Sequence, residues 1–209
     1  MGQSEALFWE EDKAMGAIVR ANQVLEFWFG AGWRDVVDLK PRSEWFQKDP
    51  NFDHAIRERF LDLYEKAIAH QLDAWMEQPE ACLALVILLD QFSRNMFRGQ
   101  AQAFAADSLA LFVASHAIDL GFDEALPPVL RQFFFFPFEH SENLAHQSFA
   151  VAKFQQFVGD SDLENTYDYA LRHRAVIEQF GRFPHRNAIL GRDSTAEEIA
   201  FLQQPGSSF

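Results

Sequence analysis

Apolar residues recur along most of the chain at intervals of three and four positions, which is the period of an amphipathic helix. The clearest stripe consists of Phe52, Ile56, Phe60, Leu63 and Ala67. Asp49 and Pro50 stand directly before it, and proline is tolerated in the first turn of a helix. The pattern therefore predicts a helix that starts near Pro50.

The same period predicts five further helices, over residues 80–97, 107–120, 141–158 and 163–180 and from residue 195 onward. Gly121 and Gly181 follow two of them as left-handed caps. Ser141 is a candidate cap for a third, and Thr195 with Glu198 forms a capping box for the last. The 80–97 segment is apolar on all sides in its first half, so we expect that helix to be central.

The sequence pattern predicts no β-strand. The apolar run 133–136 is short, does not alternate and lies between Pro128 and Pro137. Short connections between helices favour antiparallel neighbours, so the prediction is an all-α fold of stacked antiparallel helix pairs. Without an internal linker, residues 23–209 are expected to form one domain.

Composition narrows the class of protein. The chain has 209 residues, is 48% hydrophobic and carries a formal charge of −13. A hydrophobic content of this size excludes intrinsic disorder, and the acidic field argues against nucleic acid and anionic membranes as partners. The longest apolar run, residues 81–89, is too short to span a bilayer, and the acidic N-terminus is unlike a signal peptide. We expect a cytoplasmic protein and no membrane association.

Two charged residues lie in the most apolar predicted helix. Asp90 and Arg94 are four positions apart on one face and can touch, and Asn95 follows them. Charges in apolar surroundings need partners, because an unpaired buried charge costs several kcal/mol. Two interpretations remain open: a structural ion pair, or an arginine that its carboxylate orients toward an anionic ligand.

A second polar segment covers residues 137–147. Glu139, Glu142 and His146 lie on one side of a helix and could hold a divalent metal, with His140 as a further group. Their face lies opposite the apolar stripe, so a solvated helix surface is the competing interpretation. HExxH and the common nucleotide-binding motifs are absent from the sequence. We therefore expect no metal or cofactor and keep this site as an alternative.

A third segment, residues 180–192, is basic in an otherwise acidic chain. It contains Arg182, His185, Arg186, Asn187 and Arg192. Arginine suits bidentate recognition of carboxylate or phosphate, but these arginines could equally pair with the surplus acids of the protein.

Two further residues are interpreted as structural. His173 lies on a helix face with apolar neighbours and is expected to be a hydrogen-bonded core histidine. Cys82 is the single cysteine and is expected to be a buried, inert thiol.

These segments together resemble one family. The strings VLEFWFG, DQFSRNMFRG, FFFFPFEHSE and FGRFPHRN are similar to hallmark strings of a group of bacterial proteins, domain of unknown function 924. The resemblance runs from about Val24 to the Ser207 region, which leaves residues 1–22 as an N-terminal flanking segment. It implies an all-α, tetratricopeptide-repeat-like superhelix with irregular repeats, and it implies no established activity and no catalytic residues.

The leading functional hypothesis is a pocket for a small anionic ligand, with enzyme activity left open. Asp90, Arg94 and Asn95 would meet Glu139 and His140 and the group Arg182, His185, Arg186 and Asn187 at one end of the helical stack. Arg94 and Arg186 would bind a carboxylate or phosphate. His140 or His185 would be the general acid or base, and Glu139 would orient that imidazole.

The alternative hypothesis is a protein-interaction scaffold of the tetratricopeptide-repeat kind, which would bind a peptide in a concave groove. The clustered polar residues lie in predicted loops and at helix ends rather than along one helix face, which favours the pocket. The sequence indicates no oligomeric state.

Overall fold

The structure is a computed structural model that describes residues 18–208. In that part of the chain, residues 18–29 form the first helix. The later α-helices are α2 (Pro50–Ile68), α3 (Pro79–Val86), α4 (Ser93–Met96), α5 (Asp107–Asp119), α6 (Pro128–Arg131), α7 (Phe136–Glu139), α8 (Leu144–Phe154), α9 (Glu164–Phe180) and α10 (Ala196–Leu202). No strand occurs among the described residues, so the predicted all-α class is confirmed.

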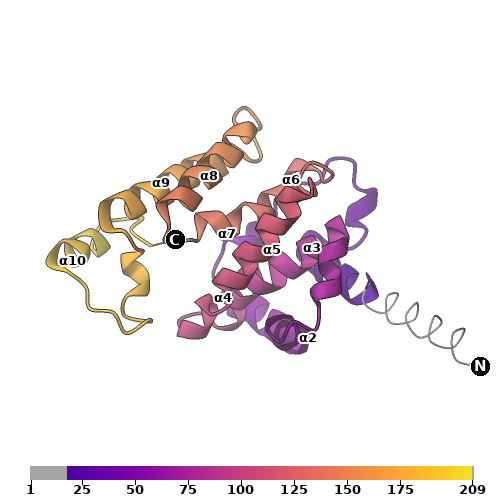
Figure 1. Cartoon of the computed structure of the whole chain (residues 1–209), viewed down its shortest axis with the longest axis horizontal. Helices are drawn as coiled ribbons and strands as arrows, with labels where there is room; N and C mark the ends of the chain where they lie inside the picture. Colours follow the sequence, from indigo (N-terminus) through magenta and orange to yellow (C-terminus); the bar gives the residue numbers. More distant parts are fainter. Residues whose placement is uncertain (1–17, 209) are drawn as a thin grey trace, which may run out of the picture.

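Short helical turns join these helices. The 3-10 turns are η1 (Trp33–Asp35), η2 (Ser43–Trp45), η3 (Asp73–Glu77), η5 (Ala101–Phe104), η6 (Gln132–Phe134), η7 (Gln155–Phe157) and η8 (Pro184–Arg186). In Figure 1, helices α2, α3, α4 and α5 form one part of the molecule, and α8 and α9 run side by side in another. The more specific superhelix implied by the family resemblance stays a prediction.

The central helix predicted over residues 80–97 is present, with one irregularity. It consists of α3, a π-helical segment η4 (Ile87–Phe92) and α4 in direct succession. Ser93 Oγ lies 2.7 Å from the carbonyl oxygen of Leu89 and 3.0 Å from that of Asp90, so it donates to the backbone where the wider π turn ends. The helix is buried as expected, and its π segment carries Asp90.

The aromatic run 133–136 belongs to the core. It lies in the succession α6, η6 and α7, where Phe133 packs edge-on against Trp45 with ring centroids 5.0 Å apart. Trp45 in turn stacks on Trp28 and donates its indole N–H to the Trp28 carbonyl at 2.7 Å. The sequence pattern did not predict this helical segment, because three prolines and a pure aromatic run carry no helical period.

Most predicted helix ends are confirmed. Asp49 caps α2, Gly181 ends α9 with φ 68°, and Thr195 forms the capping box of α10. The helix predicted over 141–158 is shorter, because Asn143 rather than Ser141 is its cap. Asn143 Oδ1 accepts the backbone N–H groups of residues 145 and 146, and η7 replaces the last turn.

The proposed boundary between residues 22 and 23 falls inside the 18–29 helix, and Ala21 is a core residue. Residues 1–17 of the predicted flanking segment lie outside the described residues. One described stretch, Ala101–Asp119, is long and apolar enough to cross a membrane by length and composition. This is weak evidence, because a core helix has the same properties, and Ala110 and Ala114 of this stretch are fully buried.

Candidate functional site

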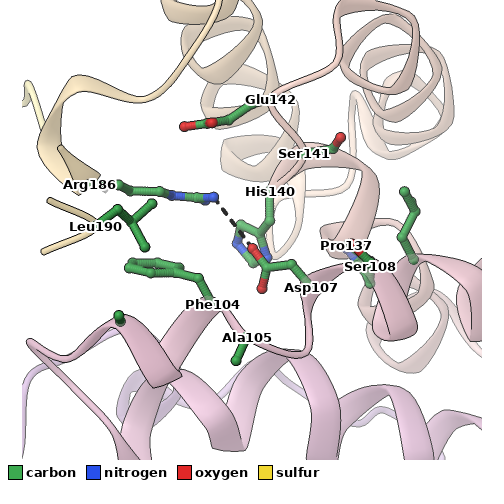
Figure 2. Close-up of a pocket in the computed structure, with 12 residues that line it drawn as sticks. Phe104, Ala105, Asp107, Ser108, Pro137, His140, Ser141, Glu142, Arg186 and Leu190 are labelled. Carbon is green, nitrogen blue, oxygen red and sulfur yellow. Dashed lines mark hydrogen bonds and ion pairs between the residues drawn. The ribbon is translucent and has the colours of Figure 1, made fainter. Parts of the chain in front are cut away.

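A cavity of about 320 Å³ lies where the segments 101–111, 137–142 and 186–190 meet. Figure 2 shows its lining. The polar lining residues are Asp107, Ser108, His140, Ser141, Glu142 and Arg186. The apolar ones are Ala101, Phe104, Ala105, Leu111, Pro137 and Leu190. Three of the polar residues were predicted from the sequence as candidates: His140 and Arg186 for the ligand site, and Glu142 for the alternative metal site.

His140 stands at the end of α7 and is held by Asp90 of the π segment. Its Nδ1 lies 2.7 Å from Asp90 Oδ1, and the Asp90 side chain is 1% exposed. Gln91 Nε2 donates to the other Asp90 oxygen at 2.6 Å. Because an ionised carboxylate only accepts hydrogen bonds, Nδ1 carries the proton, and Nε2 of a neutral His140 carries the lone pair.

Burial, followed by the charge of Arg94, lowers the pKa of His140 below its usual value, although Asp90 opposes the shift. Burial alone would raise the pKa of Asp90, but Arg94 and His140 outweigh it and bring that pKa to about 2. At neutral pH the site therefore holds an ionised Asp90 beside a neutral imidazole.

The predicted contact between Asp90 and Arg94 is present. Arg94 Nη1 lies 3.2 Å from Asp90 Oδ1. Arg94 also donates to both oxygens of Asp107 at the start of α5, at 2.9 and 3.2 Å. Arg94 thus bridges two carboxylates, and the second of these lines the cavity.

Arg186 is a buried cation with little compensation. It is 6% exposed, and its guanidinium lies between the rings of Phe104 at 4.7 Å and Phe183 at 4.4 Å. Its hydrogen bond to Asp107 Oδ2 is long, at 3.4 Å. Within residues 18–208, its Nε has no hydrogen-bond acceptor. Burial and then the neighbouring Arg94 lower the pKa of Arg186 to about 10, so the side chain remains protonated at neutral pH.

The predicted role of Glu139 is wrong. Its Oε1 lies 2.9 Å from Nδ1 of His173, and Asp90 instead orients His140. The reason is geometric: Glu139 and His140 are consecutive and point to different sides of their helical turn, whereas Asp90 approaches from the central helix. His173 is 5% exposed and hydrogen-bonded to the Tyr169 carbonyl, as expected of a core histidine.

His185 is the second predicted acid–base candidate, and it is not part of the cavity lining. Its ring lies 5.6 Å from that of Phe183. Burial, followed by the charge of Arg186, lowers its pKa to about 3. His140 is therefore the histidine that faces the cavity.

Five predicted ligand-binding residues are not part of the cavity lining: Asp90, Arg94, Asn95, Arg182 and Asn187. Asp90 and Arg94 lie behind it, where they hold His140 and Asp107. Asn95 donates to Asp53 at 2.7 Å. Arg182 is paired with Glu198 through both carboxylate oxygens, and Asn187 donates to the same carboxylate at 3.2 Å. Asn95, Arg182 and Asn187 thus each have a hydrogen-bond partner within the fold, and their predicted role in ligand binding stays a prediction.

The metal alternative is also not supported. Glu142 accepts from Arg192 at 2.6 and 2.9 Å, and His146 Nδ1 contacts Ser141 Oγ at 2.9 Å. Glu139 is turned away toward His173. In the described part of the chain, no group of three His, Cys, Asp or Glu side chains is placed to hold a metal ion.

Asp107 and Phe104 are site residues that sequence reasoning missed. An acidic residue at a helix start is ordinary, since it interacts favourably with the helix dipole. Phe104 was one of 23 phenylalanines. Neither residue carried a signal that separated it from structural ones.

Residues 24–206 match a family model described as bacterial protein of unknown function (DUF924). The chain belongs to this family. A solved structure of a protein of unknown function from Agrobacterium tumefaciens is 41% identical, with a TM-score of 0.80. The match covers 89% of this chain and 98% of that one. A comparison with curated proteins found no match. The DUF924 family model and the solved structure support the fold, and neither description gives a function.

Proposed function

We propose that this DUF924 chain binds a small anionic ligand in the 320 Å³ cavity and that His140 exchanges a proton with it. The observation that carries the proposal is Arg186. A buried charge needs close partners, because desolvation costs several kcal/mol. Within residues 18–208, Arg186 makes one hydrogen bond, at 3.4 Å, to a carboxylate that Arg94 holds more closely. An anion in the cavity would supply the missing compensation.

His140 has the features of a general base. It is neutral at pH 7, and Asp90 fixes its tautomer so that Nε2 is the basic nitrogen. It lines the same cavity as Arg186. The π-helical segment that presents Asp90 adds support, since π bulges within α-helices occur frequently at functional sites.

Ligand binding is tested by thermal denaturation and isothermal titration calorimetry with acetate, inorganic phosphate and sulfate, with chloride as the ionic-strength control. A ligand that binds only the native state raises Tm with its concentration. We expect at least one of the three anions to stabilise the wild type and not Arg186→Met. Arg172→Met is the matched control, because Arg172 is exposed and paired with Asp168. Equal responses of all three proteins would contradict the proposal.

The role of His140 is tested by diethyl pyrocarbonate, which acylates neutral imidazole nitrogens. Mass spectrometry should find His140 modified, and the anion that stabilises the protein should protect it. His140→Gln should lose that modification and keep its fold. If the anion does not slow the acylation of His140, His140 is not part of the ligand site.

The interaction scaffold is the second candidate, and one observation favours it. A second hollow of about 490 Å³ lies between the 33–39 loop and residues 125–130. Val37 in this hollow is fully exposed. Affinity capture with wild type and Val37→Asp tests it: a partner retained by the wild type and lost by the variant would support a scaffold at this surface. Identical captures would count against it.

A further inference from the structure

The cavity has two chemically different sides. Figure 2 shows Arg186, Asp107 and His140 close together, with Phe104 and Leu190 beside the guanidinium. A ligand that fills this space therefore meets charged groups and apolar groups at once. Its volume is at the small end of the roughly 300–1,000 Å³ typical of ligand pockets, which favours a small molecule.

Arg186 differs from two other arginines, the exposed Arg98 and the half-buried Arg182, in how its donors are used. Arg98 binds both oxygens of Asp53 at 2.7 and 2.8 Å, and Arg182 binds both of Glu198 at 2.7 and 2.8 Å. Among the described residues, Arg186 makes a single hydrogen bond, of 3.4 Å, to Asp107. In both pairs a guanidinium binds a planar carboxylate through two hydrogen bonds. Arg186 instead lines a cavity, and its Nε has no acceptor in the described part of the chain.

The charges around Arg186 favour a monoanion. Asp107 and Glu142 line the same cavity, and the same networks hold Asp90, Arg94 and Arg192. With His140 and His185 neutral, these carboxylates and guanidiniums are equal in number, so a ligand with one negative charge leaves a smaller excess of negative charge than a ligand with two. A phosphate ester carries about −1.5 to −2 charges at pH 7 and would meet Asp107 and Glu142 at close range. A carboxylate carries one charge and matches the flat guanidinium between two rings.

The remaining wall is apolar. Leu111 of α5, Pro137 of α7 and Leu190 follow Phe104 around the cavity. These side chains offer no hydrogen bonds, so a hydrated ligand gains nothing from them, whereas an alkyl chain or a ring gains by losing contact with water.

Resting on the proposed function, we propose that the ligand is a small monocarboxylic acid with an aliphatic or aromatic substituent. Its carboxylate pairs with Arg186, and its substituent lies against Phe104, Leu111 and Leu190. His140, fixed by Asp90, then faces the ligand from the polar side of the cavity.

The test is calorimetry on the full chain with four probes: acetate, benzoate, phenyl phosphate and neutral benzamide. We expect benzoate to bind roughly tenfold tighter than acetate or more, because burial of the ring adds apolar area. Phenyl phosphate should bind more weakly than benzoate, and benzamide should not bind measurably. Arg186→Met should lose both acetate and benzoate.

Leu190→Asn sharpens the test. Leu190 is 36% exposed, so the variant should fold, with circular dichroism as the check. It should weaken benzoate severalfold and leave acetate unchanged. Leu120→Asn is the matched control, at an exposed leucine outside the cavity lining. Nuclear Overhauser contacts from the benzoate ring to methyl groups of Leu111 and Leu190 provide a readout that needs no variant.

The outcomes separate the two proposals. If acetate binds through Arg186 and benzoate binds no tighter, the apolar-acid inference is overturned and anion binding stands. If phenyl phosphate binds tighter than benzoate, the ligand is a phosphate ester and the inference is overturned. If none of the anions binds in an Arg186-dependent way, both proposals fail.

Discussion

Arg182 and Arg186 lie four residues apart in the same loop, and their surroundings are opposite. Arg182 has its own carboxylate, Glu198, which it binds through two hydrogen bonds of 2.7 and 2.8 Å. Arg186 shares Asp107 with Arg94 and contacts it at 3.4 Å. The first arrangement holds the start of α10 against the end of α9. The second leaves a buried cation at the wall of a cavity.

The titration behaviour shows the same difference. The hydrogen bonds from Arg182 lower the pKa of Glu198 to about 2, as expected for a matched pair. The pKa of Arg186 is lowered instead, to about 10, by burial and by Arg94. A guanidinium that is paired with its own carboxylate, such as Arg182, stabilises the fold. A buried guanidinium without a close carboxylate, such as Arg186, indicates where an anionic ligand would stabilise the protein further.

Arg94→Ala should have the largest effect on stability. Arg94 joins Asp90 to Asp107, and Asp107 also contacts Arg186; these four residues form the shared network. Asp90 is 1% exposed and would be left buried without its arginine, and Asp107 would lose two hydrogen bonds. We expect a loss of about 3–5 kcal/mol in the free energy of unfolding, measured by urea melts. A loss under about 1 kcal/mol would mean that the pair behaves as an exposed one.

The paired change Asp90→Asn with Arg94→Met is the control for this loss. It removes both charges and leaves neither of them buried without its partner. The loss in the free energy of unfolding should therefore be smaller than for Arg94→Ala alone. If the double variant is the less stable of the two, the charge of Asp90 is not what makes Arg94 necessary.

Acid pH should destabilise the folded chain through His185, which lies next to Arg186 in the loop. Burial, followed by the charges of Arg186, His173 and His140, holds the folded pKa of His185 at about 3, far below its usual 6.5, although Glu142 favours the charged form. Between these values the unfolded chain binds a proton that the folded chain does not, so stability falls as pH falls.

From pH 7 to pH 5 this histidine should account for roughly 2 kcal/mol of lost stability. His185→Asn should remove that part of the pH dependence in urea melts at the two pH values. His54→Asn, at a histidine whose side chain is 69% exposed, is the matched control. Parallel curves for wild type and His185→Asn would contradict the prediction.

Glu142→Gln tests a residue that belongs both to a close ion pair and to the cavity. Glu142 pairs with Arg192 and also lines the cavity. Burial would raise its pKa, but hydrogen bonds from Arg192 and the Phe183 N–H lower it, so it is ionised at neutral pH. The variant should lose about 1.5 kcal/mol of stability and bind acetate more tightly, since a like charge is removed. Glu178→Gln, at a half-exposed carboxylate that pairs with Arg174 outside the cavity lining, is the control. Weaker acetate binding by Glu142→Gln would show that Glu142 and Arg192 help to hold the ligand.

The smallest effect should come from an exposed pair. Arg172 and Asp168 are each more than half exposed, and such pairs contribute about 0–1 kcal/mol. Arg172→Met should therefore change the urea midpoint little and leave anion binding unchanged. A loss comparable to that of Arg94→Ala would remove the distinction between matched surface pairs and the shared buried network.

Local signals in the sequence determined the helices. Periodicity and caps at Asp49, Gly181 and Thr195 act within a few residues, so the pattern alone was enough to place α2, α9 and α10. The contact between Asp90 and Arg94 was equally predictable, because one turn of a helix joins them. His140 and Arg186 could also be selected from the sequence as candidate site residues, because each is a polar residue beside an apolar run.

Only the tertiary structure decided which of these residues meet. Asp90 rather than Glu139 holds His140 from 50 positions away, and Asp107 contacts Arg186 from 79 positions away. Arg182 and Arg186 are the same residue type in the same loop, and nothing in their local sequence separates a satisfied charge from an under-compensated one. Compensation of a buried charge depends on distances to groups on other helices, and those distances exist only once the chain has packed.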